Sequence, residues 1–156
     1  MLIVGCGCRG RALAAALLAD GHAVRGTTRD GARLAKIEGV GAEAVEADPD
    51  RLGTLMTQLA GVTVVCWLLG GADGENAREL HGPRLETLLQ RLVDTPVRGI
   101  VYEAAGTVDA RLLRAGAAAV RGAGERWRMP AEVVEQDPAD HDDWLAAMRA
   151  AIGRLL

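Results

Sequence analysis

The feature that most constrains this chain is a glycine-rich loop near its start, Gly5-Cys6-Gly7-Cys8-Arg9-Gly10. The loop follows a short apolar run, residues 1–4, which is typical of a buried parallel strand. The alanine- and leucine-rich segment 11–20 comes next and predicts a helix that ends at Gly21. The order strand, G-x-G-x-x-G, helix predicts a dinucleotide-binding turn, in which free N–H groups at the helix start hold the phosphates.

Each glycine of this loop has an expected role. Gly5 would allow the tight turn, Gly7 the approach of a pyrophosphate, and Gly10 the close packing of helix on strand. We expect the residues between them, Cys6, Cys8 and Arg9, to line the same site. The alternative is a plain strand-to-helix turn without a ligand, since a bare glycine pattern also occurs there.

The next segment bears on the choice of cofactor. A second strand is predicted over 22–27, and folds that prefer NAD place a carboxylate near the tip of this strand to bind the ribose 2′-hydroxyl. Here Thr28 and Arg29 stand at the tip, and a guanidinium suits a 2′-phosphate because it offers paired, charged donors. We therefore predict NADP rather than NAD. Asp30 leaves the alternative open, either as a ribose-binding acid or as the N-cap of the next helix.

The remainder of the chain alternates between strands and helices. Further strands are predicted over 42–47, 62–69, 97–103 and 131–135, and further helices over 30–39, 51–59, 75–94, 109–121 and 139–155. Asp50 and Asp109 are expected N-caps, and Pro83 should kink or break its helix. Gly122 and Gly124 should loosen the chain before the last strand. Six alternations predict an α/β doubly wound parallel sheet (Rossmann) in the order 3-2-1-4-5-6, a single domain over residues 1–156.

The segment 62–69 is the most apolar run and is expected to be a central strand. It opens into the glycine-rich loop 70–74. Ligands of open α/β sheets lie at the carboxyl ends of strands near the reversal of strand order, which would place Leu68, Leu69, Gly70 and Gly71 beside the adenosine half of the cofactor. The alternative is an ordinary strand-to-helix connection.

Bulk properties restrict the partners. A net charge of −3 provides no footprint for nucleic acid, and no apolar run reaches the length of a membrane span or resembles a signal peptide. These features predict a cytoplasmic protein. Three cysteines do not form a disulfide framework, and we expect Cys66 to be buried. Cys6 and Cys8 lie at a helix start, where a thiol pKa can fall, but we favour a purely structural role for them and no metal site.

Three stretches carry a family resemblance: the loop 5–10 (GCGCRG), residues 24–30 (VRGTTRD) and residues 80–89 (LHGPRLETLL). With them the chain resembles the short-chain dehydrogenase/reductase superfamily, in its extended or atypical branch of epimerase- and dihydroflavonol-reductase-like proteins. The compact glycine spacing also resembles the cofactor domains of 6-phosphogluconate-type dehydrogenases. The resemblance implies that Arg29 contacts the 2′-phosphate of NADP, and that the helices over 75–94 and 109–121 form a homodimer.

The chain departs from the family at the positions where the family has its catalytic residues. Family members end the fifth strand in serines and continue to a catalytic Tyr and Lys four residues apart, whereas here the strand ends in 103–106 (EAAG). Tyr102 and Lys36 are the only tyrosine and lysine, and the family's substrate-binding lobe does not follow. Glu103 and His81 are weak candidates for an acid–base pair. We therefore predict an NADP(H)-binding protein without catalysis of its own, a sensing module that could report the NADPH/NADP ratio. The alternative is an oxidoreductase or epimerase with atypical or partner-supplied catalytic residues.

Overall fold

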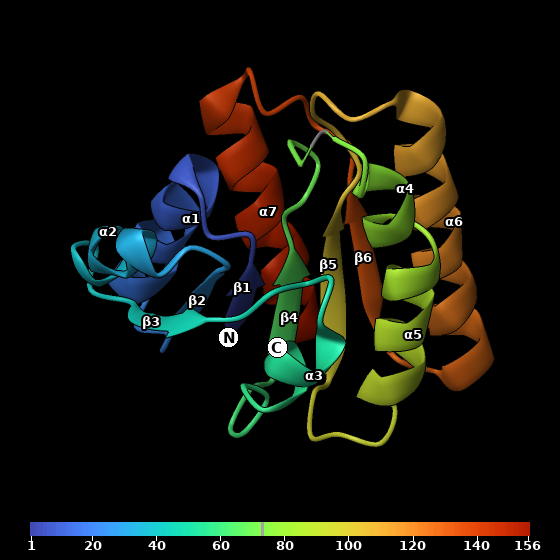
Figure 1. Ribbon diagram of the computed structural model, residues 1–156, viewed down its shortest axis with the longest axis horizontal. Helices are drawn as coiled ribbons and strands as arrows, with labels where there is room; N and C mark the ends of the chain where they lie inside the picture. The colour runs from blue at the N-terminus through green and yellow to red at the C-terminus, as the bar shows by residue number, and fades with distance from the viewer. Residues whose placement is uncertain (73) are drawn as a thin grey trace.

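The structure is a computed structural model that describes residues 1–72 and 74–156; Asp73, in the loop expected over 70–74, lies outside the described residues. Six strands form one parallel sheet in the order β3-β2-β1-β4-β5-β6 (Figure 1). The strands are β1 (Leu2–Val4), β2 (Arg25–Thr28), β3 (Glu43–Glu46), β4 (Val64–Trp67), β5 (Gly99–Glu103) and β6 (Ala131–Val134). The predicted doubly wound Rossmann topology is confirmed.

Helices cover both faces of this sheet. One face carries α1 (Cys8–Ala19), α2 (Leu34–Glu38), which a 3₁₀ turn η1 (Gly31–Arg33) precedes, and α7 (His141–Leu155). The opposite face carries α3 (Leu52–Met56), α4 (Ala77–Leu80), α5 (Pro83–Leu92) and α6 (Ala110–Trp127). Figure 1 shows α5 and α6 side by side on this second face. Successive strand residues point to opposite faces, so the sheet separates two cores.

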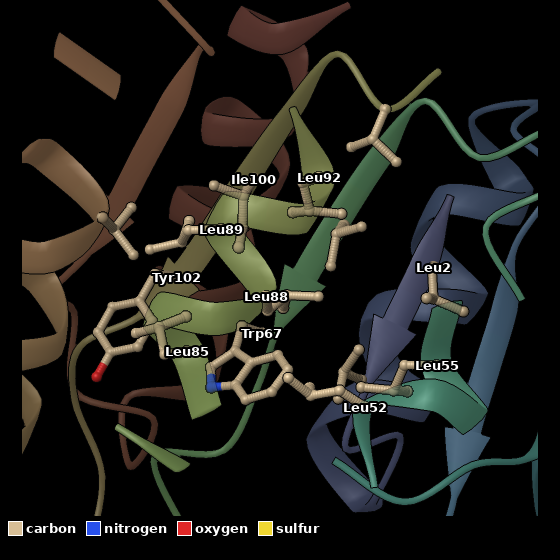
Figure 2. Close-up of a cluster of buried hydrophobic side chains, with 14 of the residues drawn as sticks. Leu2, Leu52, Leu55, Trp67, Leu85, Leu88, Leu89, Leu92, Ile100 and Tyr102 are labelled. Carbon is tan, nitrogen blue, oxygen red and sulfur yellow. The ribbon is translucent and has the colours of Figure 1, made fainter. Parts of the chain in front are cut away.

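The cores are made mostly of aliphatic side chains, as a chain without phenylalanine requires. Figure 2 shows the core under α3 and α5, where Trp67 and Tyr102 lie among leucines. Cys66 faces the other core and is fully buried, as predicted, and burial raises the pKa of its thiol to about 12. These branched and aromatic side chains make the central strands continuous apolar segments, which a sheet buried on both faces demands.

The helix predicted over 75–94 is broken rather than continuous. It divides at Gly82 into α4 and α5, and Pro83 becomes the first residue of α5. Proline is tolerated there because the missing N–H has no intrahelical acceptor at that position. The sequence alternative of a break at the residue before Pro83 is the correct one.

Two expected helix boundaries were wrong. Gly122 and Gly124 do not loosen the chain, because α6 continues to Trp127 and ends at Arg128, whose φ is 54°. A Cβ at Gly124 would lie 3.2 Å from the Ala131 side chain, so this glycine lets α6 approach β6. Asp50 is not an N-cap either. Its carboxylate accepts a hydrogen bond from Asn76 Nδ2 at 2.7 Å, across the loops that follow β3 and β4.

Candidate cofactor-binding cleft

The glycine loop leaves β1 in a conformation that only glycine adopts readily. Gly5 has a φ of 81°, and a Cβ there would lie 2.6 Å from the backbone oxygen of Leu68. The loop is then tied down by two backbone bonds, from Cys6 N to Thr27 O at 2.9 Å and from Gly7 N to Gly5 O at 2.7 Å. The turn therefore packs directly against the ends of β2 and β4.

The helix after this turn begins earlier than predicted, at Cys8 instead of residue 11. Its N-cap is Gly7, no side chain caps it, and its first-turn N–H groups have no intrahelical acceptor. A Cβ at Gly10 would lie 3.3 Å from Ile3 Cγ2, so helix and strand are in close contact there. At Gly7 a Cβ would meet nothing closer than 4.0 Å, which leaves the backbone open toward solvent. An uncapped helix start with an open approach is suited to phosphate oxygens.

A cavity of about 330 Å³ opens over this helix start. It is lined by every cofactor-site residue predicted from the sequence except one: Gly5, Cys6, Gly7, Cys8, Arg9, Gly10, Thr28, Arg29, Leu68, Leu69 and Gly71. The exception is Gly70, which is buried behind the lining residues Gly71 and Ala72. Further lining residues that sequence reasoning missed are Thr27, Arg33, Ala47, Pro49, Ala72 and Leu80. Of these, Arg33 had a usable signal, since it is a second arginine close behind Arg29 at the tip of the second strand.

The lining is positively charged. Arg9, Arg29 and Arg33 contribute to it, and no carboxylate among the described residues does. Asp30 is directed elsewhere, because its carboxylate accepts a hydrogen bond from Ala32 N at 3.0 Å and lies 3.2 Å from the Arg33 Nε. Asp30 is thus the N-cap of η1, the second of the two roles that the sequence left open. Because Arg33 is paired with Asp30 and Arg9 with Glu103, Arg29 is the lining arginine without a carboxylate partner among the described residues, and its charge favours an anionic ligand.

The two cysteines of the loop differ in their surroundings. Cys6 is buried against Gly26, and burial raises the pKa of its thiol to about 11, so the lowered pKa considered for it was wrong. A helix start lowers a thiol pKa only where the sulfur remains near water and the helix N–H groups. Cys8 is exposed at the first position of α1. Cys6 is therefore a packing residue of the turn.

The two candidates for acid–base chemistry do not form a pair. His81 is buried and bonds through Nδ1 to the Tyr102 hydroxyl at 2.6 Å and through Nε2 to the Leu69 backbone oxygen at 3.1 Å. Burial lowers the pKa of His81. Glu103 is fully buried on the opposite face of the sheet, where Arg9 binds its carboxylate. Each side chain already has its own partners.

Arg9 and Glu103 form a salt bridge between the glycine loop and the end of β5. Arg9 Nε donates to Glu103 Oε1 at 3.2 Å and Arg9 Nη2 to Oε2 at 3.3 Å, while Gly70 N donates to Oε2 at 2.9 Å. Burial raises the pKa of Glu103, and Arg9 and the Gly70 N–H oppose that rise. The pair spans the carboxyl end of β4, which lies between β1 and β5 in the sheet, at the level of Gly70.

Comparison with known proteins identifies the class of this cleft. A family model described as NAD(P)H-binding matches residues 5–150. The chain belongs to the NAD(P)H-binding family. A comparison with curated proteins found no match. The predicted resemblance is confirmed at the level of an NAD(P)H-binding domain whose fold is shared with solved reductases and epimerases.

The structural neighbours of this NAD(P)H-binding protein share its fold at low sequence identity. Triphenylmethane reductase from Citrobacter sp., solved with NADP(H), has a TM-score of 0.65 and 17% identity, with 85% of this chain and 47% of that chain covered. UDP-glucuronic acid 4-epimerase from Bacillus cereus, solved with NAD, has a TM-score of 0.65 and 16% identity, with 88% and 58% covered. BdcA from E. coli has a TM-score of 0.73 and 17% identity, with 96% and 87% covered. The chain spans about half the length of the reductase.

Residues 1–72 and 74–156 contain no group of three or more His, Cys, Asp or Glu side chains placed to hold a metal ion. In the same residues, no helix has both the length and the apolar character needed to cross a membrane. At the start of α7, Asp142 and Asp143 lie in the first turn and complement the helix dipole.

Proposed function

We propose that this NAD(P)H-binding protein binds NADP(H) in preference to NAD(H) and is a cofactor-sensing or regulatory module without catalysis of its own. The observation that carries the proposal is the charge of the cleft, in which three arginines and no described carboxylate surround an uncapped helix start. NADP(H) differs from NAD(H) by one phosphate, and Arg29, which has no ion-pair partner among the described residues, is the cleft cation that is free to bind it.

The residues present fit this cofactor. The open N–H groups of α1 after Gly7 would hold the pyrophosphate, and Arg29 and Arg33 would bind the 2′-phosphate at the tip of β2. Asp30 supports this arrangement because it holds Arg33 through a 3.2 Å ion pair and is not among the residues that line the cavity. When bound, NADP(H) would supply hydride chemistry. The chain's own part in this proposal is to bind and position it.

We further propose a single domain over residues 1–156, a homodimer and a cytoplasmic location. The cytoplasm keeps thiols reduced, which agrees with three free cysteines. The lack of autonomous catalysis is supported by the side chains at the end of β5, since Glu103 is bound by Arg9 and is followed by Ala104 and Ala105. An oxidoreductase or epimerase completed by a partner would be recognised by turnover, which is tested below.

Calorimetry of NADPH and NADH binding tests the cofactor preference. We expect NADPH to bind more tightly by about 1.5–3 kcal/mol, because a 2′-phosphate gains charge-assisted hydrogen bonds. Arg29→Ala should remove most of this difference and leave NADH affinity nearly unchanged. Arg98→Ala is the matched control. Arg98 is exposed beside the amino end of β5, whereas the cleft lies at the carboxyl ends of the strands. Equal affinities for NADPH and NADH in the unmodified protein would contradict the preference.

A further inference from the structure

The carboxyl ends of β4 and β5 are closed against each other. The salt bridge between Arg9 and Glu103 spans this edge, and Gly70 N donates to the same carboxylate at 2.9 Å. Glu103 has no exposed surface. Because a buried charge is costly unless it is paired and hydrogen-bonded, this carboxylate holds its three donors firmly and ties α1 to the end of β4 and β5.

Backbone contacts between the loops that follow β4 and β5 also close this edge. Val108 N donates to Gly70 O at 3.1 Å, so the loop after β5 rests on the loop after β4. The approach is so close that a Cβ at Gly106 would lie 2.1 Å from Gly70 O, and one at Gly70 would lie 2.0 Å from Ala105 O. Little space remains there for a ring or a sugar.

A doubly wound fold consists of two mononucleotide-binding halves, β1–β3 and β4–β6, and a dinucleotide normally crosses from one to the other. The cavity lies over the first half, β1–β3, and the adjoining segments that follow β4. Its lining comes from the glycine loop, the ends of β2 and β3, and the segments after β4, including Ala72 and Leu80. No described residue of β5, β6 or the loops after them lines it. Its volume of about 330 Å³ is near the lower end of the roughly 300–1,000 Å³ of small-molecule pockets.

We infer that the cleft recognises the adenosine 2′-phosphate 5′-diphosphate half of NADP(H), and that the nicotinamide riboside half stays outside the closed β4–β5 edge. This inference rests on the proposed function and narrows it. The phosphates lie at α1 and at Arg29, and the apolar side chains of Ala47, Pro49 and Leu68 offer a surface for the base. A site that does not hold nicotinamide cannot distinguish its oxidation states, so the protein would respond to the total NADP(H) pool rather than to the NADPH/NADP ratio.

Calorimetry with the full chain tests this with four probes: NADPH, NADP⁺, adenosine 2′-phosphate 5′-diphosphate and nicotinamide mononucleotide. The first three should bind with Kd values within about threefold of one another, a difference below roughly 1 kcal/mol, and the fourth should not bind. The emission of bound NADPH should remain that of NADPH in water, because its nicotinamide stays solvated. If NADPH binds more than about tenfold tighter than the adenosine fragment, the inference is wrong while the proposed function stands. If neither binds, both are wrong.

A matched pair of alanines provides the second readout. Ala72 is half-buried and lines the cavity, while Ala105 is half-buried in the closed segment after β5 and does not line it. Ala72→Gln should weaken NADPH and the adenosine fragment alike. Ala105→Gln should change neither, provided its melting curve matches that of the unmodified protein. A selective loss of NADPH affinity in Ala105→Gln would overturn the inference, because the nicotinamide half would then contact that segment.

Discussion

Beneath the cleft, His81 and Tyr102 form a buried chain of hydrogen bonds whose direction can be assigned. The Leu69 oxygen can only accept, so His81 Nε2 carries the proton and donates to it at 3.1 Å. A neutral ring then leaves Nδ1 as an acceptor, and the Tyr102 hydroxyl donates to it at 2.6 Å. Burial lowers the pKa of His81 and raises that of Tyr102, which keeps both side chains neutral.

The buried hydrogen bonds of His81 predict that the stability of the protein depends on pH. Because the folded-state pKa of His81 is lowered, the unfolded chain binds a proton at His81 before the folded protein does. The free energy of unfolding should therefore fall as pH drops below about 6.5, the value of an unperturbed histidine. Urea titrations between pH 7 and 5 measure the slope. His81→Gln should flatten this slope, because the buried imidazole is its source.

At the level of single residues, sequence reasoning found the ligand-facing side chains more readily than their partners. Gly5 and Arg29 occur in local patterns, so their positions could be predicted from a few neighbours. The partner of Arg9 could not, because Glu103 lies 94 residues away and meets it only when β5 takes its place in the sheet. For the same reason the separation of His81 from Glu103, on opposite faces of the sheet, became evident only in three dimensions.

Among the elements, α6 shows how one glycine fixes the distance between a helix and the sheet. A Cβ at Gly116 would lie 2.2 Å from the Tyr102 hydroxyl and 3.2 Å from the His81 backbone oxygen. The helix therefore packs directly over the hydrogen-bond chain. Gly122, two turns further along the same helix, is exposed and has nothing within 4 Å of such a Cβ.

These two glycines predict opposite effects of the same substitution. Gly116→Ala should destabilise the protein by about 1–3 kcal/mol, because an extra methyl group in a tightly packed core displaces its neighbours. Gly122→Ala should stabilise it by up to about 1 kcal/mol, since alanine loses less backbone entropy in a helix than glycine. Urea unfolding of both variants measures the two signs. Similar effects at the two positions would contradict the packing described for α6.

The order of the strands and helices could be predicted from the sequence, whereas the ends of the helices could not. Apolar runs that alternate with helical segments predict a parallel sheet, because the connection between two parallel strands contains a helix that packs on the sheet. Helix ends depend on weaker signals. Gly122 and Gly124 resemble breakers in isolation, yet Val120 and Ala123 continue the buried stripe of α6 and carry the helix past them. Tertiary packing thus outweighs the local propensity of glycine.

For the whole molecule, the two helical layers differ in what they leave exposed. On the face with α5 and α6, a groove between these helices is lined by small and apolar residues such as Ala119 and Leu89, together with the polar side chains of Glu86, Gln90 and Arg126. Small side chains let two helices of a second copy approach around a two-fold axis. We therefore expect light scattering at micromolar concentration to give about twice the 16.4 kDa of one chain.

A pair of exposed alanines tests that homodimer. Ala118→Arg on α6 should yield a monomer, because a long charged side chain would separate the paired helices, whereas Ala146→Arg on α7 should leave the mass unchanged. A mass near 16 kDa for the unmodified protein would show that the groove between α5 and α6 pairs with no second copy, and that these helices only cover the sheet.

The last expectation is that the isolated protein binds NADPH without oxidising it. Carbonyl reduction needs a proton donor beside the substrate oxygen as hydride arrives, and general acid catalysis typically contributes about 10²–10⁴-fold. Glu103 is buried and bound by Arg9, and both ring nitrogens of His81 have partners. Neither side chain is therefore available to a substrate. We expect no loss of NADPH absorbance with a panel of aldehydes, ketones and sugar nucleotides at saturating protein. Turnover abolished by Glu103→Gln or His81→Gln would identify the catalytic group, and turnover that survives both would place it elsewhere in the chain.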